Sequence, residues 1–281
     1  MTAKMPADGM VFEVRDASFA YDGRQAALDR VSLAVRRGER VTVVGANGSG
    51  KSTLLRLLDG LAFPSAGTVC AFGQELSEAA FRDDAFNFAF RRRVGLVFQD
   101  SDVQLFSPSV WDEVAFAPLQ LGLHAEEVTE RVEQALAELR IGALRDRPPH
   151  RLSGGEKKRV ALASVLSLDP EVWLLDEPSA GLDPRSEAWL EDFILGQAES
   201  GKTMVITTHD LELASAVSDR VTLFSEDHRL VGEGRPDEIL ADRALLAACN
   251  LIHEHLHRHA GTAQPHRHPH LHDGEHDHHA V

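Results

Sequence analysis

The sequence predicts an α/β fold in which a parallel β-sheet carries helices on both faces, with antiparallel β structure before it and a helical subdomain inserted into it. Short apolar runs with the composition of buried strands alternate with helical stretches along most of the chain. A glycine-rich loop separates one of these runs from the helix that follows it. A long stretch without any strand candidate interrupts the alternation and indicates the inserted subdomain.

The N-terminal part has the pattern of antiparallel strands. Apolar and polar residues alternate at 11–14 and again at 31–35, and turn signals occur at Asp22-Gly23 and Arg37-Gly38. The apolar run 41–44 then predicts the first buried strand of the parallel sheet.

Three more buried strands are predicted at 94–98, 172–175 and 204–207. An amphipathic helix is predicted over 126–139, because its apolar residues fall on one face. We expect one domain over about residues 10–250, with the helical subdomain at about 100–168. Residues 251–281 are rich in histidine and contain proline and glycine without apolar periodicity, which predicts a disordered tail.

The composition excludes several classes of protein. Acidic side chains outnumber basic ones by 44 to 29, for a formal net charge of −15, so we expect no nucleic-acid partner bound through a broad basic surface. No stretch approaches the roughly 18 apolar residues of a membrane span, and the N-terminus has no apolar signal core, which predicts a cytoplasmic chain. Cys70 and Cys249 are too few for a disulfide framework or a cysteine zinc site.

The glycine-rich loop fits the pattern G-x-x-x-x-G-K-[ST], which is typical of a phosphate-binding loop (P-loop) between a strand and a helix. Backbone amides turned inward and a helix N-terminus bind phosphate, so ATP is the expected ligand. Lys51 is expected to reach the β- and γ-phosphates, and Ser52 to hold Mg²⁺. The residues predicted to bind nucleotide here are Gly45, Ala46, Asn47, Gly48, Ser49, Gly50, Lys51, Ser52 and Thr53.

Two carboxylates end the strand at 172–175, at the sheet edge where open α/β folds bind ligands. Asp176 is predicted to support Mg²⁺, and Glu177 to orient or deprotonate the attacking water. Alone, an apolar run that ends in two acids is more often a strand that meets solvent. The P-loop upstream and Pro178 downstream favour the catalytic interpretation.

With these motifs the chain resembles the ATPase subunits of ABC transporters over about residues 10–240, and this resemblance implies an ABC-type P-loop nucleotide-binding domain. Its most specific element is the stretch Leu152 to Glu156, which matches the family signature except for glutamate where glutamine is commonest. The resemblance implies that Ser153, Gly154 and Gly155 contact ATP bound to the opposite subunit. Without that context, Ser153 would be an ordinary helix N-cap.

Four further positions match the family pattern. The resemblance implies that Tyr21 stacks on adenine, that Gln99 contacts Mg²⁺ and water and senses the membrane partner, and that His209 contacts the γ-phosphate and positions water with Glu177. Asp183 belongs to a segment by which the two subunits touch near the catalytic centre. The alternative for Tyr21 is a tyrosine in the core at a strand end.

The segments 98–106 and 110–118 resemble more narrowly the ATPases of energy-coupling factor importers, especially those of the cobalt and nickel group. That resemblance places this region in a groove that receives helices of the transmembrane protein. The side chains expected to form the docking surface are apolar Leu105, Phe106, Val110 and Phe116 and acidic Asp102, Asp112 and Glu113. The alternative is an ordinary amphipathic helix.

Of the 15 histidines, 11 lie between His253 and His279. Two groups have a spacing of two, which puts imidazoles on one side of an extended chain. Neutral imidazole binds Ni²⁺, Co²⁺, Cu²⁺ and Zn²⁺, so weak transition-metal binding is expected, although a solvated low-complexity tail is the alternative. The histidines concerned are His253, His255, His257, His259, His266, His268, His270 and His272.

The sequence therefore indicates an ATP- and Mg²⁺-dependent ATPase that energises a membrane importer, with nickel or cobalt as the expected cargo. The resemblance implies three partners, namely a second identical ATPase subunit, a transmembrane subunit and a substrate-binding membrane protein, and a peripheral location on the cytoplasmic face of the membrane. An importer of vitamins or another ABC transporter is the alternative. A non-transport ABC ATPase is less favoured, because neither a long heptad insertion nor a second ATPase cassette is present.

Overall fold

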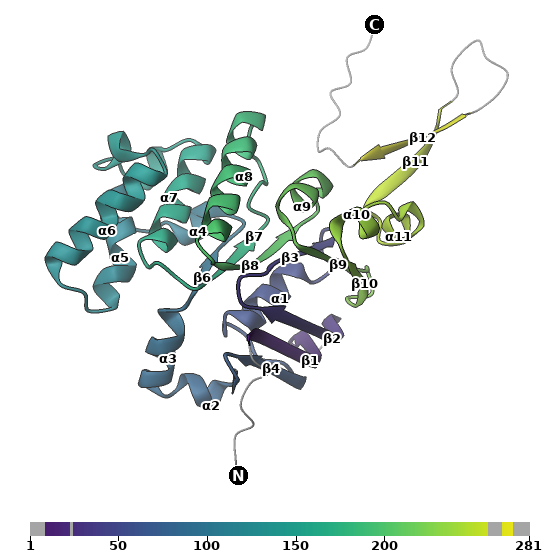
Figure 1. The fold of residues 1–281 in the computed structure, drawn as a ribbon, viewed down its shortest axis with the longest axis horizontal. Helices are drawn as coiled ribbons and strands as arrows, with labels where there is room; N and C mark the ends of the chain where they lie inside the picture. Colours follow the sequence, from purple (N-terminus) through teal and green to yellow (C-terminus); the bar gives the residue numbers. More distant parts are fainter. Residues whose placement is uncertain (1–8, 23–24, 258–265, 272–281) are drawn as a thin grey trace, which may run out of the picture.

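The computed structural model describes residues 9–22, 25–257 and 266–271 (Figure 1). A central sheet runs through the middle of the molecule. A small antiparallel sheet lies on one side of it and a group of helices, α4 to α7, on the other. Among the described residues, no helix is both long and apolar enough to cross a membrane.

The central sheet has the strand order β10-β9-β3-β8-β7-β6, and all neighbours are parallel except β9 and β10. Strands β3, β7 and β8 are buried along nearly their whole length, which explains their continuous apolar runs. The sequence analysis did not identify the two strands at the β10 edge. The strands are β3 (Arg40–Gly45), β6 (Val94–Val97), β7 (Val172–Asp176), β8 (Thr203–Thr208), β9 (Arg220–Phe224) and β10 (Leu230–Gly234).

The antiparallel sheet has the order β2-β1-β4-β5. Its buried face packs on the first helix through side chains such as Phe12, Leu28 and Val69, which share a core with Leu54. This packing fixes the end of β1, and with it Tyr21, beside the P-loop. The strands are β1 (Met10–Tyr21), β2 (Gln25–Arg36), β4 (Ala66–Ala71) and β5 (Gln74–Glu75).

The stretch between β6 and β7, all of which the structure describes, contains helices and no strand. Apolar side chains of α5, α6 and α7 form one core, which includes Val114, Val132 and Leu162. Ser109 caps α5, and Ser153 with Glu156 forms a capping box at the start of α7. The helices are α4 (Ser101–Gln104), α5 (Val110–Gln120), α6 (Ala125–Glu138) and α7 (Gly154–Leu166), with 3₁₀ turns at Gly142–Leu144 and Pro149–Arg151.

The remaining helices flank the sheets. Helix α1 begins at the P-loop, and α8 and α9 precede and follow β8. Asp183 and Asp210 cap α8 and α9, so each helix starts directly after a segment at the carboxyl edge of the sheet. The helices are α1 (Lys51–Leu58), α2 (Glu78–Phe81), α3 (Asp84–Arg91), α8 (Pro184–Glu199), α9 (Leu211–Val217), α10 (Pro236–Ile239) and α11 (Arg243–Ala248).

The histidine-rich tail contains a hairpin, which projects away from the sheets in Figure 1. Strand β11 (Ile252–His257) pairs antiparallel with β12 (His266–Leu271), with His253 opposite His270 and His255 opposite His268. This differs from the expectation of a tail without regular structure. A spacing of two is also the period of a strand, so the pattern that separated the histidines is compatible with pairing. His259 and His272 lie outside the described residues.

Candidate functional site

The P-loop connects β3 to α1, and its backbone shape depends on glycine. Gly48 and Gly50 have φ values of 82° and 113°. A Cβ on Gly50 would lie 2.3 Å from the carbonyl oxygen of Ala27, so a side chain would clash with β2 there. Glycine at both positions therefore lets the loop close around a phosphate while its amides and the N-terminus of α1 face inward.

Lys51 is the first residue of α1 and is buried. Its ammonium group donates to the carbonyl oxygens of Gly45, at 2.7 Å, and Ala46, at 3.1 Å. It also lies 3.0 Å from Oε1 of Glu177, which has no other polar partner in the described part of the chain. The lysine of the P-loop and the proposed catalytic carboxylate thus form a buried ion pair.

Glu177 links Lys51 to His209. Its Oε2 atom lies 2.9 Å from Nδ1 of His209 and 3.3 Å from the His209 backbone nitrogen. Burial favours a higher pKa for Glu177, but the hydrogen bond from His209 and the charge of Lys51 hold that pKa below its ordinary value. The same hydrogen bond raises the pKa of His209. Glu177 is therefore a carboxylate at neutral pH, ready to accept a proton.

The backbone of Glu177 adopts a left-handed conformation, with φ of 42°. Its N–H donates to the carbonyl oxygen of Thr207, at 2.9 Å, and so extends the ladder between β7 and β8 by one residue. This contact fixes a backbone angle that glutamate rarely adopts. The strained position directs the carboxylate toward Lys51 and His209.

Asp176 has the surroundings of a Mg²⁺ ligand. Its Oδ1 atom accepts hydrogen bonds from Ser52 Oγ, at 2.9 Å, and Thr207 Oγ1, at 2.6 Å. Carboxylate, hydroxyl and phosphate oxygens suit this hard cation. The residues present therefore fit a Mg²⁺ ion that Ser52 and Asp176 would hold next to bound phosphates.

A pocket of about 660 Å³ opens over the P-loop. Tyr21 stands at its margin with 44% of its surface exposed, and its hydroxyl contacts Thr53 Oγ1 at 3.3 Å and Arg56 Nη1 at 2.8 Å. An exposed aromatic face beside a phosphate loop suits the stacking of a base. The pocket is lined by Tyr21, Ala27, Asn47, Gly48, Gly50, Lys51, Ser52, Thr53, Arg56, Gln99, Glu177 and His228.

Apart from the tail histidines, nine predicted site residues do not line this pocket. Five of them contact residues that do, namely Gly45, Ala46, Ser49, Asp176 and His209. The other four lie at the starts of α7 and α8. Ser153 caps α7 and, with Gly154 and Gly155, lies at its N-terminus, whereas Asp183 caps α8 by accepting from the Arg185 and Ser186 amides. Their assignment to a site shared with a second subunit remains a prediction. Within one chain, Ser153 and Asp183 act as helix caps, and Gly154 and Gly155 belong to the first turn of α7.

Sequence reasoning missed three residues near the P-loop. Arg56 donates to Tyr21, His228 Nδ1 lies 3.0 Å from the carbonyl oxygen of Ser49, and Lys158 donates to the carbonyl oxygen of Gln99 at 2.8 Å. Arg56 has a local signal, since it lies one helical turn after Ser52 and Thr53. The other two come from distant segments and have none.

The docking surface expected on the helical subdomain is only partly present. Val110 is fully buried and is therefore not available to a partner, whereas Leu105 is half-buried and packs against the core. Glu113 is also buried, at 3% exposed, and accepts from the backbone nitrogens of Phe106, at 2.9 Å, and Ser107, at 2.7 Å. The prediction was wrong for Val110 and Glu113, because both are buried and Glu113 supports the loop before α5. The exposed apolar side chains are Val103, Phe106, Phe116 and Leu119.

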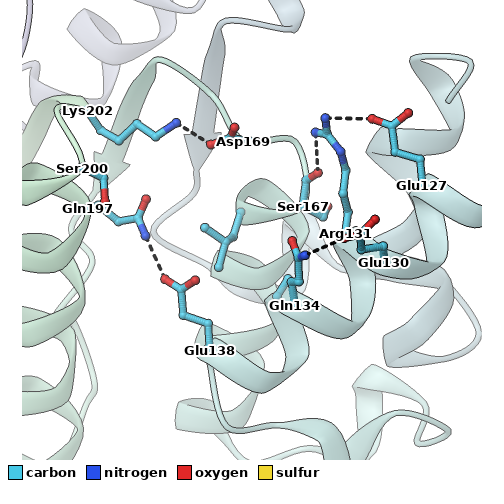
Figure 2. A pocket seen from close by; sticks show the side chains of 12 residues that line it. Glu127, Glu130, Arg131, Gln134, Glu138, Ser167, Asp169, Gln197, Ser200 and Lys202 are labelled. Carbon is cyan, nitrogen blue, oxygen red and sulfur yellow. Dashed lines mark hydrogen bonds and ion pairs between the residues drawn. The ribbon is translucent and has the colours of Figure 1, made fainter.

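A second pocket, of about 500 Å³, lies between α6, the end of α7 and the end of α8 (Figure 2). Its charged and polar side chains pair with one another. Gln197 donates to Glu138 at 2.9 Å, Arg131 donates to Glu127 at 3.0 Å, and Lys202 pairs with Asp169. No residue of this pocket belongs to the P-loop or to the carboxylate pair, so it is separate from the nucleotide site.

Known proteins resemble this chain over most of its length. The ABC transporter family model matches residues 28–180. The nickel import ATP-binding protein NikO of Rhodobacter capsulatus is 52% identical over 86% of this chain and 95% of its own length. The cobalt import ATP-binding protein CbiO of the same organism is 48% identical over 82% of this chain and 80% of its own.

The fold has a close counterpart among solved structures. The cbiO1 protein of Clostridium perfringens, part of the ABC transporter complex cbiONQ, superimposes with a TM-score of 0.74 and 34% identity, over 87% of this chain and 96% of that one. The predicted fold class is thereby confirmed, including the antiparallel N-terminal sheet. With its P-loop pocket and buried carboxylate, the chain belongs to the ABC transporter family and is one of its ATPases.

Proposed function

We propose that this ATPase energises a membrane importer of the energy-coupling factor type whose cargo is nickel or cobalt ions. The observation that carries the hydrolytic part is the contact chain from Lys51 through Glu177 to His209 at the P-loop pocket. The names and 48–52% identity of the nickel and cobalt import relatives support the choice of cargo. The alternative is an importer of vitamins, and the transport test must distinguish it from an importer of nickel or cobalt.

The hydrolytic mechanism follows from the positions of these side chains. ATP enters the P-loop pocket with adenine against Tyr21, and its phosphates replace Glu177 as the partner of Lys51. Glu177, released from that ion pair, accepts a proton from the attacking water, and His209 holds Glu177 and donates toward the γ-phosphate. Bound Mg²⁺ supplies positive charge at the phosphate oxygens, and Ser52, Asp176 and Gln99 would hold it.

Two copies of the chain form the complete enzyme in this proposal. Ser153 at the N-terminus of α7 is exposed and does not line the P-loop pocket of its own chain. A helix N-terminus with free amides suits the γ-phosphate of ATP bound to the second subunit. Asp183, at the start of α8, would lie at the same junction. Mixed dimers of Lys51→Ala and Ser153→Arg chains test this, because trans action leaves one composite site intact whereas cis action leaves none.

Four exposed apolar side chains, which we call the docking ridge, support docking of a transmembrane subunit. They are Val103, Phe106, Phe116 and Leu119. Phe106 and Phe116 pack edge to face, with ring centroids 4.9 Å apart, and form an apolar ridge. Such a ridge is suited to an apolar helix of a partner. The chain is then peripheral, on the cytoplasmic face of the membrane, beside that subunit and a substrate-binding membrane protein.

The histidine-rich tail is proposed to bind Ni²⁺ or Co²⁺ weakly. Imidazole is a ligand for these ions, but affinity alone does not select nickel over copper or zinc. Truncation of residues 253–281 is expected to keep ATP hydrolysis and remove most Ni²⁺ binding in calorimetry. Protonation of histidine near pH 6.5 removes the lone pair that a metal needs, so binding should weaken from about pH 7.5 to pH 5.5. Equal Ni²⁺ binding by the truncated chain would contradict a tail site.

Transport by the assembled complex tests the proposal directly. The ATPase is reconstituted with its membrane partners in vesicles, and ATP-dependent uptake of radioactive nickel, cobalt and a vitamin is compared. Uptake of nickel or cobalt, abolished by Glu177→Gln, is the expected result. Uptake of the vitamin alone would reject the proposed cargo while leaving the ATPase mechanism intact.

A further inference from the structure

Lys158 is a buried lysine that the mechanism above does not use. It lies in the second turn of α7, is 3% exposed, and donates to the carbonyl oxygen of Gln99 at 2.8 Å. The ion pairs of lysines in the described part of the chain involve Lys51, Lys157 and Lys202 but not Lys158. Burying an ammonium group without a paired carboxylate is unfavourable, so stability does not explain this residue.

Residues 98–106, which we call the linker segment, make several contacts with α7, and the hydrogen bond from Lys158 is one of them. Lys157, the preceding residue, pairs with Asp102 at 2.6 Å. Gln104 donates to the carbonyl oxygen of Ala161, at 3.0 Å, and accepts from the backbone nitrogen of Phe98, at 3.1 Å. These bonds fasten the linker segment to α7 along its length, so it should move together with that helix.

The two ends of the linker segment serve different surfaces. Gln99, near its start, lines the P-loop pocket. Val103 and Phe106, toward its far end, are 71% and 66% exposed on the proposed docking ridge. Of the contacts with α7, the hydrogen bond from Lys158 is the one made directly to Gln99.

We propose that Lys158 is a positioning residue that holds the backbone of Gln99 against α7, at the place from which the Gln99 side chain reaches Mg²⁺ at the P-loop. Lys158 acts through Gln99 and does not itself touch the nucleotide. The inference rests on the proposed function, in which Gln99 contacts Mg²⁺. It adds a buried side chain of α7 on which the position of Gln99 depends.

The direction in which Mg²⁺ affinity changes when Lys158 is replaced distinguishes a positioning role from a purely electrostatic one. Asp176 and Glu177 are close enough to Lys158 to interact with its charge. If Lys158 acted only through that charge, its removal would strengthen Mg²⁺ binding at these carboxylates. If it positions Gln99, its removal releases a Mg²⁺ contact and weakens binding.

The test measures the Mg²⁺ concentration that half-saturates ATP hydrolysis by the full-length protein. Lys158→Met is expected to raise it by about three- to tenfold, the range for the loss of one ordinary hydrogen bond. Gln99→Ala should raise this concentration similarly. The double variant should add little to Gln99→Ala, because each single change removes the contact between the Gln99 side chain and Mg²⁺. Methionine has a similar length and replaces a buried charge, so thermal unfolding should show an intact fold.

Lys202→Met is the matched control, since it removes the same charge at the second pocket, away from the P-loop (Figure 2). It should leave the Mg²⁺ dependence unchanged. An unchanged or lower half-saturating concentration in Lys158→Met, full additivity with Gln99→Ala, or an equal shift in Lys202→Met would each overturn the positioning role. Undiminished hydrolysis by Lys51→Ala would instead reject the proposed ATP site itself.

Discussion

Replacing Glu177 by glutamine should separate nucleotide binding from hydrolysis. The substitution keeps the shape of the side chain but removes the charge that lies 3.0 Å from Lys51 and the proton acceptor that lies 2.9 Å from His209. A positioned general base contributes about 10²- to 10⁴-fold to a rate. That range corresponds to roughly 3–5 kcal/mol of transition-state stabilisation, and the turnover number should fall accordingly.

The same substitution should leave ATP binding intact or tighten it. In the wild type, incoming phosphates must displace a buried carboxylate from Lys51, because both partners are nearly inaccessible to water. Glutamine interacts with the Lys51 ammonium group only as a neutral acceptor, so ATP has a weaker interaction to displace when it binds. The variant should therefore accumulate with ATP bound, as a dimer.

The assay combines steady-state phosphate release with equilibrium binding of a fluorescent ATP analogue. Expected results are a loss of at least about 100-fold in turnover and a dissociation constant no higher than that of the wild type. Near-normal turnover would refute the role of Glu177 as base. Weaker ATP binding would refute the competition between Glu177 and phosphate for Lys51.

Contacts around the site lead to three further predictions. The hydrogen bond that His209 donates to Glu177 raises the pKa of His209, so its stabilising effect is fully present below the unfolded pKa near 6.5 and is lost as pH rises through the folded value. Chemical denaturation should therefore show a larger deficit in unfolding free energy for His209→Ala at pH 6 than at pH 9, and the reverse trend would contradict the pairing. Arg56→Met removes the 2.8 Å bond to the Tyr21 hydroxyl and should raise the KM for ATP about two- to fivefold with kcat unchanged; a fall in kcat alone would exclude a role in holding the base. Phe106→Asp places a charge on the docking ridge and should abolish co-purification with the membrane partner while basal hydrolysis persists, whereas Lys202→Met, the control, should leave co-purification intact.

The sequence was most informative where local order determines local structure. A buried strand followed by glycines and a lysine permits few other arrangements, and the structure has β3, the loop and α1 in that order. The carboxylates at the end of β7 were likewise placed by the strand before them. Parallel strands share their carboxyl edge, which brings Glu177 to the P-loop without any local signal of contact.

Residues whose environment depends on packing between distant segments were misjudged or missed. Glu113 had the pattern of a surface acid on an amphipathic helix, but it folds back to accept two backbone N–H groups of the loop before α5. Lys158 was not singled out from the sequence at all, and of the neighbouring lysines Lys157 and Lys158 only Lys158 is buried. Helical periodicity assigns a face to a residue, but it does not show which loop covers that face.

The left-handed backbone at Glu177 has a consequence for attempts to stabilise this enzyme. Two unfavourable features coincide at that residue, a φ of 42° in a residue with a Cβ and a carboxyl group removed from water. Glycine adopts this backbone without steric penalty and carries no charge to bury. Its introduction would, however, leave the Lys51 ammonium group buried without a carboxylate, a cost of about 3–5 kcal/mol that exceeds the roughly 1–3 kcal/mol of backbone strain relieved. Glu177→Gly should therefore lower the melting temperature as well as turnover, so a robust version of this ATPase has to keep the strained glutamate.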